Sequence, residues 1–380
     1  MKIEIERIID LTKRLIKTKP ENPPGLEEPT AMVIKEELEK MGAEVKVEYV
    51  QDKRPNVIGI FKGKKPGKIV LFNGHSDVVP AGPNWSMPPF EGIVKDDKLY
   101  GRGAVDMLGG LAAMLEAVRV FINEHPDFLG EIIYTVVVGE ETGGIGAKKI
   151  VQENLKADYV IVGEPSNNVI YVGERGILWC KIKCEGKSAH ASLPHKGVNA
   201  IEVLIRALLA LKEMKLEYGP HKYFGIHTFN IGKIEGGIKA NIVAPSAEAT
   251  IDMRLPPGTK ISTVKEKLKE LLDAYEKMYD VKFDVEYIIE SDAYETPENS
   301  DLVLKFKLAA EEVLGKEVKL GGMMGATDGR FFYEKGMKTI IFGPGPLSCA
   351  HTADEYVESP SLLNAAKVYY RALEKLLLED

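Results

Sequence analysis

The first 175 residues alternate runs of branched apolar residues with amphipathic segments, and this alternation strongly constrains the fold. Runs such as 68–74 ("KIVLFNG") and 132–138 ("IIYTVVV") are typical of strands that are buried on both faces of a parallel sheet. Segments between them, such as 107–122, have the composition of helices that cover such a sheet. We therefore expect an α/β domain with a mostly parallel sheet flanked by helices.

The pattern changes near residue 177, where apolar and polar residues begin to alternate as in strands with one buried face. Two amphipathic helices are interleaved with these strands, and this combination predicts a small α+β layer. After about residue 290 the α/β pattern returns. We therefore predict one domain made of residues 1–176 plus 291–380, and an inserted domain of residues 177–290. The predicted helices span 27–41, 107–122, 145–155, 198–213, 261–279, 300–314, 327–335 and 361–378.

Composition excludes several classes of partner. Acidic residues outnumber basic ones, 57 against 50, and the formal charge of −7 argues against a nucleic-acid surface or an anionic membrane. The N-terminal segment is predicted to be an amphipathic helix, not a signal peptide, and no apolar run is long enough to span a bilayer. Three cysteines give no disulfide framework, which favours a cytoplasmic protein.

Imidazole and carboxylate side chains follow the predicted buried strands. Because the carboxyl ends of parallel strands meet at one edge of a sheet, we expect these side chains to lie close together. The alternative for the paired acids in "GEETGG" is a solvated loop, with the acids near a helix N-terminus that favours negative charge. The candidate residues are His75, Asp77, Asp106, Glu140, Glu141, Glu164 and His351.

Two imidazoles and several carboxylates form a donor set that suits Zn²⁺, Co²⁺ or Mn²⁺ better than Ca²⁺. A shared carboxylate could hold two such metals ~3.5–4 Å apart, with a hydrolytic water between them. We expect one of Glu140 and Glu141 to bind metal while its neighbour acts as a general base. Asp77 lies two residues after His75 and is predicted to accept the other ring N–H of that histidine.

Five motifs resemble a family of two-metal hydrolases that includes acetylornithine deacetylase, succinyl-diaminopimelate desuccinylase, aminoacylase and glutamate carboxypeptidase. They are "FNGHSDVVP", "PPFEGIVKDDKLYGRGAVDMLGG", "GEETGG", "VGEPS" and "GPGPLSCAHTADEYV". The resemblance implies a zinc-peptidase-like catalytic domain with an inserted lid and dimerisation domain. It implies His75, Asp106 and Glu164 around one metal, Asp106, Glu141 and His351 around the other, and Glu140 as the base. It also implies a cis peptide bond between Asp106 and Met107.

The inserted segment also resembles the lid of that family. The resemblance implies that His190, in "GKSAHASLPHKG", polarises the scissile carbonyl with Asn241 beside it. It also implies that Arg175 and Arg254 hold the substrate carboxylate, a task that suits a bidentate guanidinium. Pairing of two lids would form a homodimer in which His190 serves the active site of the partner.

The expected function is hydrolysis of an N-acyl amino acid by a metal-bridged water that Glu140 activates. Deacetylation and desuccinylation are both open, as are aminoacylase, carboxypeptidase and dipeptidase action. An alternative of another class is a metal-binding assembly protein without turnover, but the intact base and ligand set argue against it. One departure from the family pattern is Leu108, where a lysine is common, and this position is not a ligand.

Overall fold

The computed structural model describes residues 2–153, 155–216 and 219–378. The chain divides into two compact units. The crossings between the units fall at residues 173 and 295, close to the predicted 176 and 290. The first unit comprises Met1–Gly173, Thr296–Met323 and Thr327–Asp380, and the second comprises Glu174–Glu295 and Met324–Ala326.

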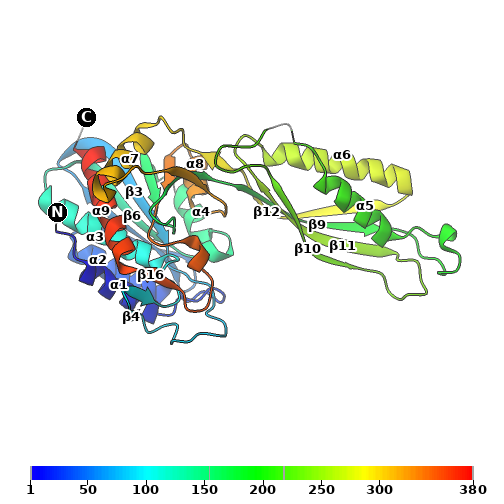
Figure 1. Cartoon of the computed structure of the whole chain (residues 1–380), viewed down its shortest axis with the longest axis horizontal. Helices are drawn as coiled ribbons and strands as arrows, with labels where there is room; N and C mark the ends of the chain where they lie inside the picture. Colours follow the sequence, from blue (N-terminus) through cyan, green and yellow to red (C-terminus); the bar gives the residue numbers. More distant parts are fainter. Residues whose placement is uncertain (1, 154, 217–218, 379–380) are drawn as a thin grey trace. The chain divides into compact units, whose positions relative to one another are not determined.

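A nine-stranded sheet forms the centre of the first unit, and Figure 1 shows its strands β3 and β6 with α3 and α9 on one side and α4 and α8 on the other. The strand order is β1-β2-β6-β3-β7-β15-β8-β13 with β14 beside β8, and the two residues of β13 are counted with the second unit. The central strands β6, β3, β7 and β15 are parallel, whereas β2 pairs antiparallel with both of its neighbours, β6 and β1. The predicted α/β sheet is therefore confirmed. The strands are β1 (Glu44–Gln51), β2 (Arg54–Lys62), β3 (Lys65–His75), β6 (Leu129–Val137), β7 (Tyr159–Val162), β8 (Ile170–Glu174), β13 (Tyr294–Glu295), β14 (Leu320–Met323) and β15 (Lys338–Ile341).

Helices cover both faces of this sheet because successive side chains of a buried strand point to opposite faces. On one face Phe72 of β3 packs edge-on against Tyr369, with ring centroids 5.5 Å apart. On the other face Leu71 belongs to a core that includes Ile150 and Phe332. The first face is covered by α1 (Ile5–Lys17), α2 (Glu28–Lys40), α3 (Leu108–Glu124), α7 (Asp301–Leu314) and α9 (Ser359–Leu377), and the second by α4 (Ile145–Gln152) and α8 (Gly329–Glu334).

A small antiparallel sheet with the order β16-β5-β4 lies outside the main sheet. Its strands are β4 (Ile93–Lys95), β5 (Lys98–Tyr100) and β16 (Tyr356–Glu358). Tyr356 pairs with Tyr100, so this sheet joins the segment before Asp106 to the segment after His351. Strands of three residues carry too little periodicity to be predicted from a sequence.

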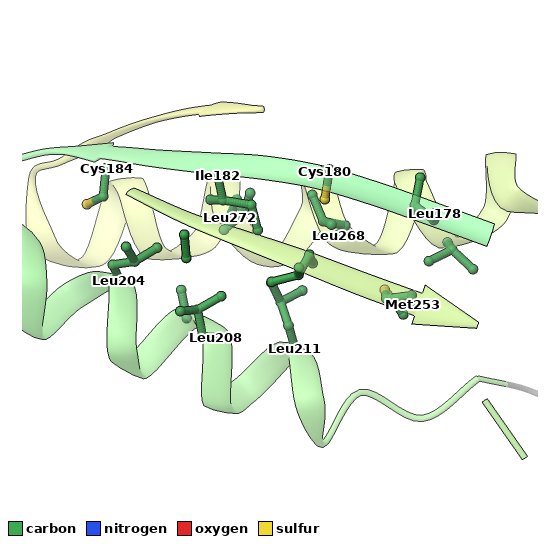
Figure 2. Close-up of a cluster of buried hydrophobic side chains, with 14 of the residues drawn as sticks. Leu178, Cys180, Ile182, Cys184, Leu204, Leu208, Leu211, Met253, Leu268 and Leu272 are labelled. Carbon is green, nitrogen blue, oxygen red and sulfur yellow. The ribbon is translucent and has the colours of Figure 1, made fainter. Parts of the chain in front are cut away.

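The second unit is a four-stranded antiparallel sheet with the order β10-β11-β9-β12, covered by two helices. Its core is formed by side chains from one face of the sheet and from both helices, and it includes Cys180 and Cys184 (Figure 2). These two cysteines are therefore packing residues. The elements are β9 (Gly176–Glu185), α5 (Ala200–Lys212), β10 (Thr228–Gly236), β11 (Ser246–Leu255), α6 (Ile261–Tyr279) and β12 (Lys282–Ser291).

All three cysteines are free thiols. Within the described residues, none of the helices combines the length and the apolar character that crossing a membrane requires. Helix α1 confirms the amphipathic N-terminal helix, with Ile8, Leu11 and Leu15 buried and charged residues between them.

Candidate metal centre

Parallel pairing brings the predicted site residues to one edge of the main sheet. His75 ends β3, Glu140 follows β6, and Glu164 follows β7, and these three strands are neighbours in the sheet. Asp106 lies just before α3, and His351 follows a short 3₁₀ turn after β15. The expectation that these residues converge is therefore met by the sheet topology.

Two triads share the Asp106 carboxylate. His75 Nε2 lies 3.1 Å from Asp106 Oδ1 and 3.4 Å from Glu164 Oε1. His351 Nε2 lies 3.2 Å from Asp106 Oδ2 and 3.0 Å from Glu141 Oε1. Each histidine thus faces one oxygen of the shared aspartate and one oxygen of its own glutamate.

These separations suit metal ligands. Two ligands placed tetrahedrally at about 2.0–2.1 Å from one Zn²⁺ ion are ~3.3 Å apart. The N···O distances of 3.0 to 3.4 Å in the two triads match that spacing. The donor set of imidazoles and carboxylates also suits a borderline divalent cation. The residues present therefore fit two divalent metal ions that share Asp106.

Glu140 lies against the first triad. One of its carboxylate oxygens is within 4.8 Å of ligand atoms of both His75 and Glu164. Burial raises the pKa of Glu140 well above its usual value, and the charge of the nearby Asp328 carboxylate raises it further. Glu141, the next residue, instead directs its carboxylate at His351. Glu141 also has an oxygen within 4.8 Å of ligand atoms of His75 and Asp106, so the two adjacent glutamates both border His75 but differ in their other partners.

Glycines shape the turn that carries these two glutamates. Gly139 has φ 74°, and Gly143 and Gly144 have φ 115° and 73°. Such left-handed conformations cost glycine little, whereas residues with a Cβ rarely adopt them. A Cβ at Gly139 would also lie only 2.6 Å from the Ile145 side chain. The pattern "GEETGG" thus specifies a one-turn 3₁₀ helix, Glu140–Thr142, directly after a buried strand.

The Asp77 carboxylate binds the backbone of the Glu140–Thr142 turn. Its Oδ1 accepts the backbone N–H of Glu140 at 3.2 Å, and its Oδ2 accepts the backbone N–H of Glu141 at 3.1 Å. The prediction that the Asp77 carboxylate accepts the ring N–H of His75 is therefore wrong, because the nearby acceptor is the Asp77 backbone oxygen. His75 Nδ1 lies 2.8 Å from the backbone oxygen of Asp77 but 3.7 Å from its carboxylate. The carboxylate is turned toward the two peptide N–H groups, which have no other acceptor at the start of the turn.

A second buried carboxylate holds the backbone at Asp106, and the sequence did not predict it. Glu355 Oε1 accepts the backbone N–H groups of Val105 and Asp106 at 3.0 and 3.2 Å. Its Oε2 accepts a hydrogen bond from the buried Arg102 guanidinium at 2.5 Å. The peptide bond from Asp106 to Met107 is cis, as the resemblance implies. Glu355 stands inside the motif "AHTADEYV", but its partner lies about 250 residues away and the motif alone does not reveal it.

The two triads perturb the ionisation of their members. Burial alone would raise the pKa of Asp106, but hydrogen bonds from His351 and His75 outweigh it and hold this pKa below its usual value. The same contact with Asp106, together with Glu141, raises the pKa of His351 to about 10. Burial, reinforced by the charge of Asp106, raises the pKa of Glu164 to about 8. A divalent cation would relieve this crowding of negative charge.

In the second unit, His190 and Asn241 lie side by side. His190 forms an isolated antiparallel bridge with Ile242, the residue after Asn241, and the Ala191 N–H donates to the Asn241 carbonyl at 3.1 Å. The Ser192 backbone N–H donates to His190 Nδ1 at 3.2 Å, which leaves the ring proton on Nε2. His190 is exposed, so its Nε2–H can serve as a donor.

The two predicted carboxylate-binding arginines differ in their surroundings. Arg175 is 8 % exposed and donates to the backbone carbonyls of Phe224 and Ile226. Arg254 forms a bidentate pair with Asp252 on the same strand, at 2.8 and 3.1 Å. The contacts of Arg175 favour a structural role, whereas the Arg254 guanidinium lies on the face of the sheet opposite the buried Met253 and Leu255.

Known proteins resemble most of this chain in sequence. The profile of peptidase family M20/M25/M40 matches residues 71–375. A succinyl-diaminopimelate desuccinylase from Psychrobacter sp. is 33% identical over 323 residues, which cover 82% of this chain and 80% of that protein. The enzyme of the same name from Nitrosospira multiformis is 31% identical and covers 91% of this chain and 92% of its own.

Solved structures share the fold. Aminopeptidase PepT from Bacillus cereus superposes with a TM-score of 0.85 at 25% identity, covering 98% of this chain and 99% of its own. A tripeptidase from Staphylococcus aureus superposes with a TM-score of 0.81 at 27% identity, with the same coverage. Sequence and structure thus agree on a hydrolase that acts on amide bonds. The chain belongs to peptidase family M20/M25/M40.

Proposed function

We propose that the chain is a two-metal amidohydrolase that releases the acyl group of N-acyl amino acids, with N-succinyl amino acids as the first substrates to test. The observation that carries this proposal is the pair of triads in which His75 and His351 face opposite oxygens of Asp106. The sequence relatives that cover most of the chain are named as desuccinylases, which favours a succinyl over an acetyl group.

The proposed roles follow from the geometry of the triads. His75, Asp106 and Glu164 would hold one divalent ion, and Asp106, Glu141 and His351 would hold the other. The ligand chemistry suits Zn²⁺ best, with Co²⁺ or Mn²⁺ as substitutes. When bound, such ions polarise the scissile carbonyl and make water more acidic.

Glu140 is the proposed general base. Its carboxylate takes a proton from the attacking water as the water oxygen bonds to the carbonyl carbon. It then gives that proton to the amide nitrogen as the C–N bond breaks, so the products are a carboxylic acid and an amine, and proton transfer between them gives a carboxylate and an ammonium group. Its position beside the first triad, at the same end of the sheet, supports this role.

The inserted unit is proposed to act as a lid and to form a homodimer. Edge strand β10 exposes Ile231 and Ile234, and α5 exposes Ile205 and Leu209. Exposed apolar side chains beside an unpaired strand edge favour pairing with a second copy of the chain. In the dimer, His190 would donate its Nε2–H to the developing oxyanion in the partner's site, a contribution of typically ~2.7–4 kcal/mol to catalysis.

Substrate contacts are assigned to the same unit. Arg254 is proposed to exchange its Asp252 pair for the free carboxylate of the substrate, and Asn241 to donate its side-chain amide beside His190. Arg175 is left with a positioning role, because its guanidinium already binds the carbonyls of Phe224 and Ile226.

A second candidate function is cleavage of short peptides, because the two solved structures that superpose with TM-scores of 0.85 and 0.81 are an aminopeptidase and a tripeptidase. A released-amine assay separates the two. The panel is N-succinyl-L,L-diaminopimelate, N-acetylornithine, N-acetylmethionine and a tripeptide, each with and without a chelator. We expect chelator-sensitive release from the acyl amino acids, with the succinyl substrate fastest. Release from the tripeptide alone would favour the peptidase, and release unaffected by chelator would contradict the metal mechanism.

A further inference from the structure

A segment near the N-terminus is attached directly to the loop that carries Asp77. Asn22 is only 3 % exposed, and its backbone N–H donates to the Val78 carbonyl at 2.8 Å. In return, the Val78 N–H donates to the Pro20 carbonyl at 2.9 Å. These two hydrogen bonds fix the Asn22 backbone against the loop that leaves β3, so its side chain has a defined direction.

The Asn22 side chain reaches both ends of the base-carrying turn. Its Nδ2 donates one hydrogen to Asp77 Oδ2 at 2.8 Å and the other to Thr142 Oγ1 at 2.9 Å. Asp77 in turn accepts the backbone N–H groups of Glu140 and Glu141. The Asn22 amide group thus links the Asp77 carboxylate, which binds the start of the Glu140–Thr142 turn, to Thr142 at the end of that turn.

We propose that Asn22 is a positioning residue for Glu140, a role that rests on the proposed function of Glu140 as the base. Asp77 Oδ2 accepts from both Asn22 and the Glu141 N–H, so loss of Asn22 removes one of the donors that fix its side-chain angle. Hydrogen bonds to an ionised carboxylate are among the stronger ones in proteins, and buried networks hold geometry cooperatively.

Loss of Asn22 should displace the Glu140 carboxylate more than it weakens metal binding. Glu141 is also held by its contact with His351, and a bound ion would hold it further. Glu140 has no metal in the proposed mechanism, so the placement of its carboxylate depends on the backbone of the turn. A shift of about 1 Å in a catalytic group can cost ~10²-fold in rate.

The first test is Asn22→Ala and Asn22→Asp in the full-length, metal-loaded protein with the succinyl substrate. We expect kcat to fall ~10- to 100-fold in Asn22→Ala, with KM within about twofold and two metals still bound. Asn22→Asp removes both donor hydrogens and sets a second carboxylate beside Asp77, so we expect a larger fall. An unchanged kcat in a folded Asn22→Ala protein, or a loss of metal, would overturn the positioning role.

Thr30→Val is the matched control. Thr30 is fully buried in the same N-terminal region, and its hydroxyl forms a hydrogen bond with the Thr18 hydroxyl. Its loss should lower the melting temperature without changing kcat. If Thr30→Val lowers kcat as much as Asn22→Ala does, the effect comes from general destabilisation and the proposal is wrong.

A double-mutant cycle with Asp77→Asn tests the path of the effect. Because Asn22 acts through Asp77, the two losses in kcat should not multiply, whereas independent residues would give multiplicative losses. Amide hydrogen exchange of Glu140 and Glu141 gives a readout that needs no activity, and it should be faster in Asn22→Ala than in Thr30→Val. If the wild-type protein releases no amine but exchange is faster in Asn22→Ala, the proposed function is refuted, whereas the role of Asn22 in fixing the turn is supported. Exchange equal to that of wild type would refute the fixing of the turn.

Discussion

The Glu355 carboxylate accepts the backbone N–H of Asp106 at 3.2 Å, although the two residues are 249 positions apart. Arg102 joins this contact, because it donates to Glu355 and also to the carbonyl of Thr352, the residue after His351. Two proposed ligands of the second metal, Asp106 and His351, are thus tied to one buried ion pair. The ion pair sets the distance between the loops that carry them.

The main effect of removing the Glu355 side chain should be weaker metal binding. Loss of an outer contact that orients a ligand typically costs ~10- to 100-fold in metal affinity. Because Asp106 is shared, we expect Glu355→Ala to bind both ions more weakly, with the larger loss at the second ion, whose ligands Asp106 and His351 both lie on loops held by the ion pair. Titration against a competing chelator measures both affinities. Glu358→Ala is the control, because Glu358 is exposed at the end of β16, the strand that directly follows Glu355. Two ions bound at wild-type affinity in Glu355→Ala would show that the ion pair does not support the site.

Metal uptake should release protons. Asp106 and Glu141 raise the pKa of His351 to about 10, so this imidazole is protonated at neutral pH in the metal-free protein and must lose its proton to bind metal. Affinity should therefore increase as pH rises toward 10. Calorimetry in two buffers of different ionisation enthalpy should give proton release that is reduced in His351→Ala. Equal release in both proteins would contradict the assignment.

The same shift predicts how the metal-free protein depends on pH. The folded pKa of His351 lies above the ordinary value of 6.5, so its contribution to stability is complete below 6.5 and is lost as pH rises through about 10. The melting temperature of metal-free wild type should thus decrease more between pH 7 and 10 than that of His351→Ala. Parallel curves would mean that the imidazolium is not stabilised in the folded state.

Much of the fold could be predicted from the sequence because its strands are buried on both faces and its helices are amphipathic. Helix α6 was predicted with its observed bounds, 261–279, and α2 and α7 within one residue at each end. The convergence of His75, Glu140 and Glu164 followed from the rule that parallel strands end at one edge. These features depend on periodicity and topology, which a single sequence carries.

What the sequence could not give depends on side-chain direction and on distant partners. Asp77 was placed beside His75, but its carboxylate turns toward the peptide N–H groups of Glu140 and Glu141, about 60 residues away. Asn22 and Glu355 act through contacts that span 55 and about 250 residues. No local pattern reports which of several buried polar groups will meet.

The two arginines of the inserted unit should respond differently to substitution. Arg254→Gln is expected to raise KM at least tenfold with little change in melting temperature, because the proposed partner of Arg254 is the substrate and its protein pair is half-exposed. Arg175→Gln should lower the melting temperature, since it leaves the carbonyls of Phe224 and Ile226 without this donor. Steady-state kinetics and thermal unfolding of both variants check this contrast. A higher KM in Arg175→Gln together with a lower melting temperature in Arg254→Gln would contradict it.

Action of His190 in trans can be tested by mixing inactive subunits. Glu140→Ala and His190→Ala should each be nearly inactive as homodimers. After subunit exchange, a heterodimer contains one site with an intact base and an intact partner histidine, so up to about a quarter of wild-type activity should return in an equal mixture. No recovery after confirmed exchange, or full activity of a monomer, would exclude this arrangement.

In the proposed mechanism the adjacent glutamates have different roles, with Glu140 as base and Glu141 as metal ligand. The most direct measurement counts bound metals and kcat together in Glu140→Ala and Glu141→Ala, using the released-amine assay on the succinyl substrate. Glu140→Ala should keep two metals and lose ~10²–10⁴-fold in kcat. Glu141→Ala should lose occupancy of one site. A Glu140→Ala protein that keeps wild-type kcat, or that loses a metal while Glu141→Ala keeps both, would contradict these roles of the two glutamates.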